Sequence, residues 1–147
     1  MKQKKRPHQV FLDSGIFVAF LDRSDRWHTA AKALFGSPPR TWCTSLLVVS
    51  ETHSWFLHRL GEEPARAFQA FLRELKGVVL LEATRAHHVA TLRMLTRLRG
   101  SKLTYVDASS LTFMELHGIG EAWSTDSHLR LLGARVSPAP AGRAMPG

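Results

Sequence analysis

Short apolar runs alternate with segments of helical periodicity along most of the chain. The runs at residues 10–12, 41–44, 77–81, 121–125 and 134–137 are short and bounded by polar or turn residues, which is typical of strands. Helical spacing predicts helices over residues 14–21, 25–35, 46–60, 64–75, 85–99, 105–117 and 127–132. Because strands and helices follow one another in this way, the sequence predicts an α/β protein built from βαβ units around a parallel sheet.

Local signals fix several of the predicted element ends. Ser45 and Thr84 are placed to cap the helices that follow them, and Pro64 fits the first turn of a helix. Gly61 and Gly100 each end a helical segment. The chain contains no internal repeat and no linker between two domains, and only residues 138–147, rich in Pro, Gly and Ala, are predicted to be a disordered tail.

Length and composition indicate a single globular domain. The chain has 147 residues, with 44% hydrophobic and 22% charged residues. No apolar run approaches the ~20 residues that span a bilayer, and the basic start lacks the apolar stretch of a secretory signal. The single cysteine, Cys43, excludes an internal disulfide and is expected to pack as a small apolar side chain. We therefore expect a cytoplasmic protein without a membrane segment.

The charge balance favours a polyanionic partner. There are 20 Lys and Arg residues against 12 Asp and Glu residues, a net charge of +8. Basic residues gather in an arm at residues 1–7 and around the end of the helix at 85–99. The second group consists of Arg93, Arg97, Arg99 and Lys102. Nucleic acid is the partner that such a field favours, and the alternative is a solvated helix face with a solubilising arm.

Four carboxylates stand where an α/β fold would expose them at one edge of its sheet. Asp13 and Asp126 end the predicted strands at 10–12 and 121–125, and Asp107 opens the helix at 105–117. Glu51 lies inside the helix at 46–60. The carboxyl ends of parallel strands form the ligand crevice of an open sheet, so all four are expected to meet there.

Helical spacing suggests that two of these acids face the core. Glu51 falls in one stripe with Leu47, Val48, Trp55 and His58. The same test groups Asp107 with Leu111 and Met114. A carboxylate on a core-facing side needs a partner, because burying an unpaired charge is unfavourable.

Each Asp also has an ordinary structural interpretation. Asp107 could cap its helix or complement the helix dipole, and Asp13 and Asp126 could be strand-to-helix turn residues that cap the next helix. Taken together, the acids favour a metal site instead. Carboxylate oxygens without clustered His or Cys select Mg²⁺ or Mn²⁺ over Zn²⁺, and two such ions can support phosphodiester cleavage.

Three sequence blocks that contain the four acids follow one another along the chain. The first, FLDSGIFVAFLDRSDRWHTAAKALF, has a strand ending in Asp-Ser and then a helix. The second is TSLLVVSETHSWFLHRLG, which contains Glu51. The third, LTYVDASSLTFMELHGIGEAWSTDSHLRLLGARV, has an Asp that opens a helix, then a Gly, a strand and Thr-Asp. In this order the blocks resemble the PIN-domain nucleases, and among them the VapC-like toxins of type II toxin–antitoxin systems, with Glu51 at the acidic position of the second block. The resemblance covers about residues 8–137.

The resemblance implies a three-layer α/β/α sandwich with a central parallel sheet. It implies that the metal ligands and catalytic acids are Asp13, Glu51, Asp107 and Asp126. Ser14 and Thr125 would be accessory hydroxyls that orient a ligand or water. The VapC-like subset further implies an antitoxin partner and a homodimer.

The sequence thus predicts a Mg²⁺- or Mn²⁺-dependent endoribonuclease that leaves a 5′-phosphate, with Arg99 and Lys102 holding the RNA backbone. Two alternatives stay open: a non-catalytic RNA- or partner-binding module that keeps the acids only as caps, and a PIN nuclease of RNA processing or decay outside a toxin system.

Overall fold

The computed structural model describes residues 8–38 and 40–139. This part of the chain contains, in order, β1 (Gln9–Leu12), α1 (Ser14–Leu21), α2 (His28–Phe35), β2 (Thr41–Ser45), α3 (Leu46–Arg59), α4 (Glu62–Glu74), β3 (Val79–Leu81), α5 (Arg85–Arg97), α6 (Tyr105–His117), β4 (Glu121–Ser124), a short 3₁₀ helix η1 (His128–Arg130) and β5 (Arg135–Pro138). The predicted basic arm at residues 1–7 lies outside the described residues, as do residues 140–147 of the predicted tail.

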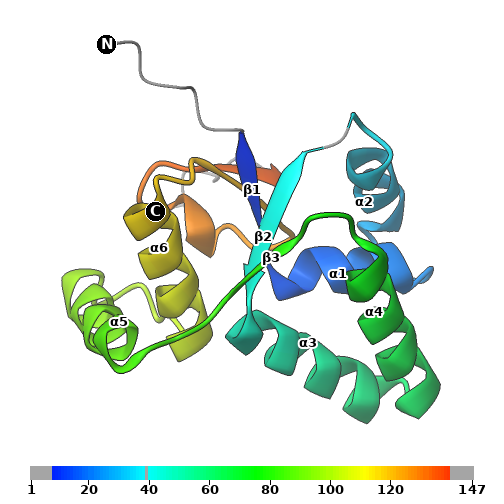
Figure 1. Cartoon of the computed structure of the whole chain (residues 1–147), viewed down its shortest axis with the longest axis horizontal. Helices are drawn as coiled ribbons and strands as arrows, with labels where there is room; N and C mark the ends of the chain where they lie inside the picture. The colour runs from blue at the N-terminus through cyan, green and yellow to red at the C-terminus, as the bar shows by residue number, and fades with distance from the viewer. Residues whose placement is uncertain (1–7, 39, 140–147) are drawn as a thin grey trace, which may run out of the picture.

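All strand pairs are parallel, and the five strands lie in the order β3-β2-β1-β4-β5. Helices α1–α4 lie on one side of this sheet and α5 and α6 on the other, with β1 and β2 between the two groups (Figure 1). The predicted α/β fold with a central parallel sheet between helical layers is therefore confirmed. Within the part of the chain that the structure describes, no helix is long and apolar enough to cross a membrane.

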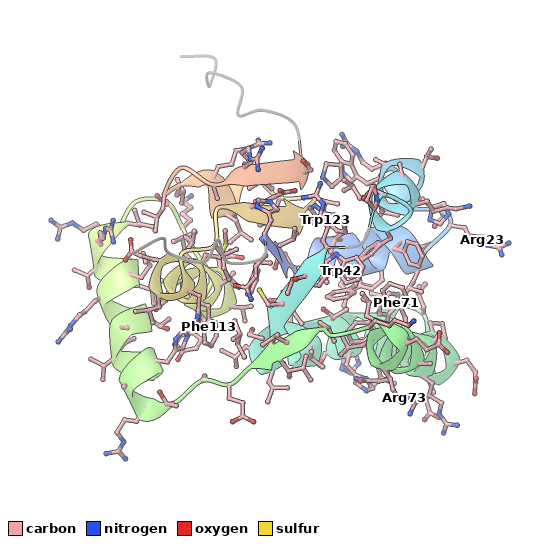
Figure 2. The ribbon with its side chains drawn as sticks, turned by 45° about the horizontal axis from the view of Figure 1, so that its top comes forward. Arg23, Trp42, Phe71, Arg73, Phe113 and Trp123 are labelled. Carbon is pink, nitrogen blue, oxygen red and sulfur yellow. The ribbon has the colours of Figure 1, made fainter. Side chains whose placement is uncertain are left out.

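Aromatic side chains hold the α1–α4 layer against the sheet. The Phe35 ring of α2 lies 5.1 Å from the Trp123 ring of β4 and 5.3 Å from the Phe71 ring of α4, both edge to face. Phe20 of α1 stacks on Phe71 at 4.7 Å. Figure 2 shows Trp42 and Trp123 on the strands with Phe71 facing them from α4. Burying each ring contributes roughly 2–3 kcal/mol, so this cluster is a main source of layer cohesion.

Several predicted element ends are confirmed. The helices at 14–21 and 105–117 have the predicted bounds. The Ser45 hydroxyl accepts a hydrogen bond from the Val48 backbone N–H at 3.1 Å, and the Thr84 hydroxyl accepts one from the His87 N–H at 3.1 Å. Cys43 is buried, as predicted, and burial raises the pKa of its thiol to about 12.

Other predictions were wrong where local side chains compete with the helical pattern. The predicted helix at 25–35 begins only at His28, because the Asp25 carboxylate accepts the Trp27 N–H at 2.8 Å and fixes a turn. The predicted helix at 127–132 is only the 3₁₀ helix η1. The α4 helix begins two residues before Pro64, at Glu62, with Pro64 still in its first turn.

The strand predictions need two corrections. The run at 77–81 forms only the short strand β3, which is an edge strand of the sheet that the described residues form. Val79 and Leu80 of β3 are 41% and 43% exposed. Pro138, assigned to the disordered tail, is the last residue of β5. Ala139 is buried and its N–H donates to the Ser124 carbonyl at 3.1 Å.

A buried ionic cluster ties together the amino ends of three strands. The Glu121 side chain, at the start of β4, is 11% exposed, and its Oε1 faces His8 at 2.5 Å and Arg40 at 3.1 Å, just before β1 and β2. Its Oε2 accepts the Trp123 indole N–H at 3.2 Å. Burial alone would raise the pKa of Glu121, but the hydrogen bonds from His8 and Trp123 and the Arg40 charge outweigh it and lower the pKa.

We expect Glu121→Gln to destabilise the protein by about 2–3 kcal/mol near neutral pH, because it leaves buried donors and Arg40 without their carboxylate. A lowered pKa stabilises the folded state above the unfolded-chain value of 4.5, and this contribution is lost as the pH falls through the folded value. The deficit of Glu121→Gln should therefore shrink below about pH 4 in urea denaturation. The control is Glu115→Gln, which removes an exposed pair with Arg97 and should cost less than about 1 kcal/mol. A Glu121 deficit no larger than the Glu115 deficit would contradict this role.

Candidate metal-binding and catalytic site

Asp13 lies at the centre of the acidic edge because β1 ends beside β4. Leu12 of β1 is in register with Trp123 of β4, and the Asp13 N–H continues the ladder by donating to the Trp123 carbonyl at 3.1 Å. Asp13 then becomes the N-cap residue of α1. The residue is 5% exposed, and its Oδ2 accepts a hydrogen bond from the Ser124 hydroxyl at 2.8 Å.

The pKa of Asp13 is raised from 3.8 to about 6. The main cause is burial, which disfavours the charged form, and the negative charges of Asp107 and Glu51 add to it. Hydrogen bonds from the Ser124 hydroxyl and the Ser14 backbone N–H act in the opposite direction without cancelling the rise. Three of the four predicted acids therefore interact electrostatically.

Glu51 is half-buried, but it does not lie at the centre of the core-facing stripe of its helix, as was predicted. The residues of α3 that are buried are Val48, Thr52 and Phe56, whereas His58, predicted to share the stripe with Glu51, is exposed. The core-facing stripe is thus rotated by about one residue relative to the prediction. Glu51 consequently lies at the border of the buried face, where its carboxylate still influences Asp13.

Asp107 has a structural role and also faces the acids. It is the third residue of α6, and its Oδ2 accepts the Thr104 backbone N–H at 3.4 Å while the Thr104 hydroxyl accepts the Asp107 N–H at 3.1 Å. This capping box is the helix-capping role that the sequence left open as an alternative for Asp107. Its side chain is nevertheless only 16% exposed and raises the pKa of Asp13, while Leu111 and Met114 are buried as predicted.

Asp126 lies two residues beyond β4 and is tied to the same network. Its backbone N–H donates to the Ser124 hydroxyl at 3.0 Å, so Ser124 links Asp126 to Asp13. The Asp126 side chain is 50% exposed, the most open of the three aspartates. Its Oδ1 accepts the His128 backbone N–H at 2.8 Å.

Two residues of this edge were missed in the sequence. Ser124, and not the neighbouring Thr125, is the hydroxyl that bonds Asp13. Strand alternation could have indicated it, because residues 122 and 124 share the face opposite to residue 123. His128 is the second: its Nδ1 lies 3.0 Å from Asp126 Oδ1 and 3.5 Å from Asp107 Oδ2.

The two predicted accessory hydroxyl residues, Ser14 and Thr125, both lie next to the start of α1, and their predicted role in orienting a ligand or water stays a prediction. Ser14 reaches Asp13 through its backbone N–H. Thr125 packs against Gly15 in the first turn of α1, where a Cβ atom added to the glycine would lie 2.2 Å from the Thr125 hydroxyl oxygen. Glycine at position 15 therefore allows α1 to begin close to the segment that follows β4.

The donor chemistry of this edge fits a hard divalent cation, although the side chains are not arranged around one. Among residues 8–38 and 40–139, no group of three or more His, Cys, Asp or Glu side chains is placed to hold a metal ion. The available donors are carboxylate oxygens, with Asp13 carrying a raised pKa near two other acids. Such a concentration of negative charge is relieved by a bound cation.

Arg99 and Lys102 are exposed in the loop between α5 and α6. Lys102 has a positive φ of 55°, which is uncommon for a residue other than glycine. It stands two residues before Thr104, the partner of Asp107 in the capping box. The loop therefore lies beside the end of α6 that carries Asp107.

Comparisons with known proteins identify the family and the fold. The PIN domain family matches residues 10–134. The structure of Mycobacterium tuberculosis VapC20, described as a Sarcin-Ricin loop cleaving toxin, is similar with a TM-score of 0.79 and 28% identity over 85% of this chain and 95% of that chain. A comparison with curated protein sequences gives no match.

Two complexes share the fold at lower identity. VapBC2 from Rickettsia felis, bound to a DNA fragment from its promoter, has a TM-score of 0.65 and 10% identity, over 87% of this chain and 96% of that chain. A toxin–antitoxin complex from Klebsiella pneumoniae has a TM-score of 0.62 and 16% identity, over 86% of this chain and 94% of that chain.

We expect the metal-free Asp13→Asn variant to become more stable relative to the wild type as the pH rises from 4 to 7, because the wild type loses stability over this range. Below pH 4 the folded and unfolded chains both keep the Asp13 proton; between about pH 4 and 6 only the folded chain keeps it, so rising pH destabilises the wild type. Above pH 6 the full penalty applies, about 3 kcal/mol for two pKa units. The difference in unfolding free energy between variant and wild type should therefore grow by about this amount from pH 4 to pH 7.

The measurement is urea denaturation in EDTA across this pH range. Asp22→Asn, at the opposite end of α1, is the matched control. A pH-independent difference for Asp13→Asn would contradict the raised pKa.

Proposed function

Because the chain belongs to the PIN-domain family, we propose that it is an endoribonuclease that requires Mg²⁺ or Mn²⁺ and leaves a 5′-phosphate. The observation that carries the proposal is the convergence of Glu51 and Asp107 on the buried Asp13, whose pKa the charges of both acids raise. Acids that serve only as caps do not need to influence one another. Asp126 joins the group through Ser124.

Each residue of the site has a definite task in this proposal. Asp13, Glu51, Asp107 and Asp126 would hold the cation, which when bound supplies positive charge for a developing phosphodiester oxyanion and for activation of a water. The Ser124 hydroxyl fixes the orientation of the Asp13 carboxylate by donating to Oδ2. The capping box fixes Asp107 at the start of α6. Burial of Asp13 strengthens its electrostatic interaction with a bound cation.

RNA is the proposed substrate, and a Sarcin-Ricin loop is the first candidate. The similar VapC20 is described as cleaving the Sarcin-Ricin loop. The net charge of +8 and the exposed Arg99 and Lys102 beside the α6 end suit a phosphate backbone.

An antitoxin is the proposed protein partner, since several similar structures are toxin–antitoxin complexes. An aromatic hollow of about 430 Å³ offers a surface for it, lined by Phe20, Phe35, Trp42, Phe71 and Leu75 together with Glu74 and Lys76.

A homodimer is also proposed. Apolar side chains are exposed on the edge strand β3, at Val79 and Leu80, and on α5, at Val89 and Leu92. Contiguous exposed apolar surface often marks a contact between proteins, and Val89 and Leu92 line one hollow on α5.

Cleavage in the presence of Mg²⁺ or Mn²⁺ is the decisive test. The purified protein should cut an RNA that contains a Sarcin-Ricin loop sequence internally, and EDTA should abolish cleavage. Asp13→Asn should lower the rate by about three orders of magnitude, since metal-centred charge stabilisation contributes several kcal/mol. Asp22→Asn should retain wild-type activity. Cleavage that persists in EDTA, or that survives Asp13→Asn unchanged, would contradict the proposed metal-dependent mechanism. Absence of cleavage with either metal would favour the non-catalytic binding module.

The role of the basic loop is tested by the salt dependence of RNA binding. Each phosphate contact with single-stranded RNA contributes about 0.7 log unit of affinity per tenfold change in salt. Arg99→Ala combined with Lys102→Ala should reduce this slope by about one to two contacts. The control combines Arg23→Ala and Arg73→Ala, which project from the α1–α4 side (Figure 2). Equal slopes in the two double variants would mean that Arg99 and Lys102 do not hold RNA.

A further inference from the structure

A pair of aromatic side chains lies at the start of α6, beside the acidic edge. His88 is exposed and Tyr105 is partly exposed; the Tyr105 hydroxyl and His88 Nδ1 share a hydrogen bond of 2.8 Å. Tyr105 is the first residue of α6 and stands two residues before Asp107. The two Cα atoms therefore lie within about 7.6 Å, since consecutive Cα atoms are about 3.8 Å apart. The pair is thus next to one of the acids that influence Asp13.

The contact between α5 and α6 has a buried centre that does not include this pair. The two helices lie side by side (Figure 1), and the buried His87 of α5 contacts α6. Its ring stacks on Phe113 with the centroids 3.7 Å apart, and its Nε2 shares a hydrogen bond of 2.8 Å with the Ser109 hydroxyl. The rings of His88 and Tyr105 are 5.8 Å apart and inclined by 36°. They meet through their polar atoms and do not cover each other face to face.

Basic side chains stand on both segments that carry the pair. Arg85 lies three residues before His88, so the two share one side of α5. Lys102 stands three residues before Tyr105, and both Arg85 and Lys102 are exposed. Aromatic rings among cations are the arrangement by which proteins hold single-stranded nucleic acid, because the cations follow the phosphates while the rings stack on the bases.

We propose that His88 and Tyr105 form a base-stacking platform that takes an unpaired nucleobase of the RNA close to the phosphate to be cut. This inference rests on the proposed endoribonuclease function, and it narrows the substrate to RNA that presents an unstacked base. Successive nucleotides of a stacked strand advance about 3.4 Å, so a base on Tyr105 belongs to a nucleotide within about three positions of a phosphate at Asp107. The opposing possibility is that the pair only joins α5 to α6.

Replacement of the Tyr105 ring separates base stacking from helix packing. Binding of an RNA that contains a Sarcin-Ricin loop sequence is measured in EDTA, which keeps the RNA uncut. Tyr105→Leu should weaken binding by about five- to a hundredfold, because an apolar side chain without a ring face cannot stack on a base. Tyr105→Phe keeps the ring and should bind within about threefold of the wild type. The salt dependence of binding should stay unchanged in Tyr105→Leu, since no phosphate contact is lost.

Two further variants complete the test. His88→Ala, at an exposed position, should weaken binding by about two- to tenfold, because it removes one ring and the hydrogen bond that orients Tyr105. Trp27→Leu is the matched control, because Trp27 is a partly exposed aromatic residue at the start of α2, on the other side of the sheet (Figure 1). It should bind RNA as the wild type does.

Wild-type affinity in Tyr105→Leu overturns the proposal, as does an equal loss in Tyr105→Phe or in Trp27→Leu. Should Tyr105→Leu not fold, unchanged affinity in His88→Ala overturns it. If the wild type cuts RNA but Tyr105→Leu binds normally, only this inference fails. If binding follows the expected pattern but neither Mg²⁺ nor Mn²⁺ supports cleavage, the nuclease function fails and the platform stands. A wild type that binds no RNA contradicts both.

Discussion

The parallel pairing of β1 with β4 holds the acidic edge together. Leu12 and Trp123 form the last residue pair between these two strands, so the next residues, Asp13 and Ser124, lie side by side at the carboxyl ends of the strands. A hydrogen bond of 2.8 Å then joins their side chains, and Ser124 extends the link to Asp126. A shift of one residue in this register would turn Asp13 to the opposite face of the sheet. The site is therefore positioned by backbone pairing more than by contacts among the acids.

Burial gives this edge its electrostatic character. Asp13 is almost fully enclosed by the β1–α1 junction, so poor solvation of its charge, with other acids nearby, raises its pKa to about 6. Neutral hydrogen-bond donors, the Ser124 hydroxyl and the Ser14 N–H, offset only part of this penalty. A folded chain that maintains such a group stores an unfavourable interaction which a cation can relieve, as expected of a functional site.

The two ends of the sheet treat buried carboxylates in opposite ways. At the amino ends of the strands, Glu121 has His8, Arg40 and the Trp123 indole as partners, and its pKa is lowered. At the carboxyl ends, Asp13 has other acids for neighbours and its pKa is raised. The partners of Glu121 stabilise the folded state, whereas the surroundings of Asp13 destabilise it. This contrast indicates that the acidic edge has a functional and not a structural role.

Local periodicity and hydrogen bonding were enough to predict the alternation of strands and helices, the helices at 14–21 and 105–117, the caps at Ser45 and Thr84, and the approach of Asp13 and Asp107 to one another. Helical spacing placed Glu51 on the right side of α3 but erred by about one residue, since the packing of Val48, Thr52 and Phe56 sets the rotation. Folding of the whole chain was needed to select Ser124 over Thr125, to bring His128 between Asp107 and Asp126, and to assemble the cluster around Glu121. Most of these contacts join residues that are far apart along the chain, and the choice between Ser124 and Thr125 depends on a difference of one position. Strand register and core packing determine such contacts, and the local sequence pattern carries no information about them.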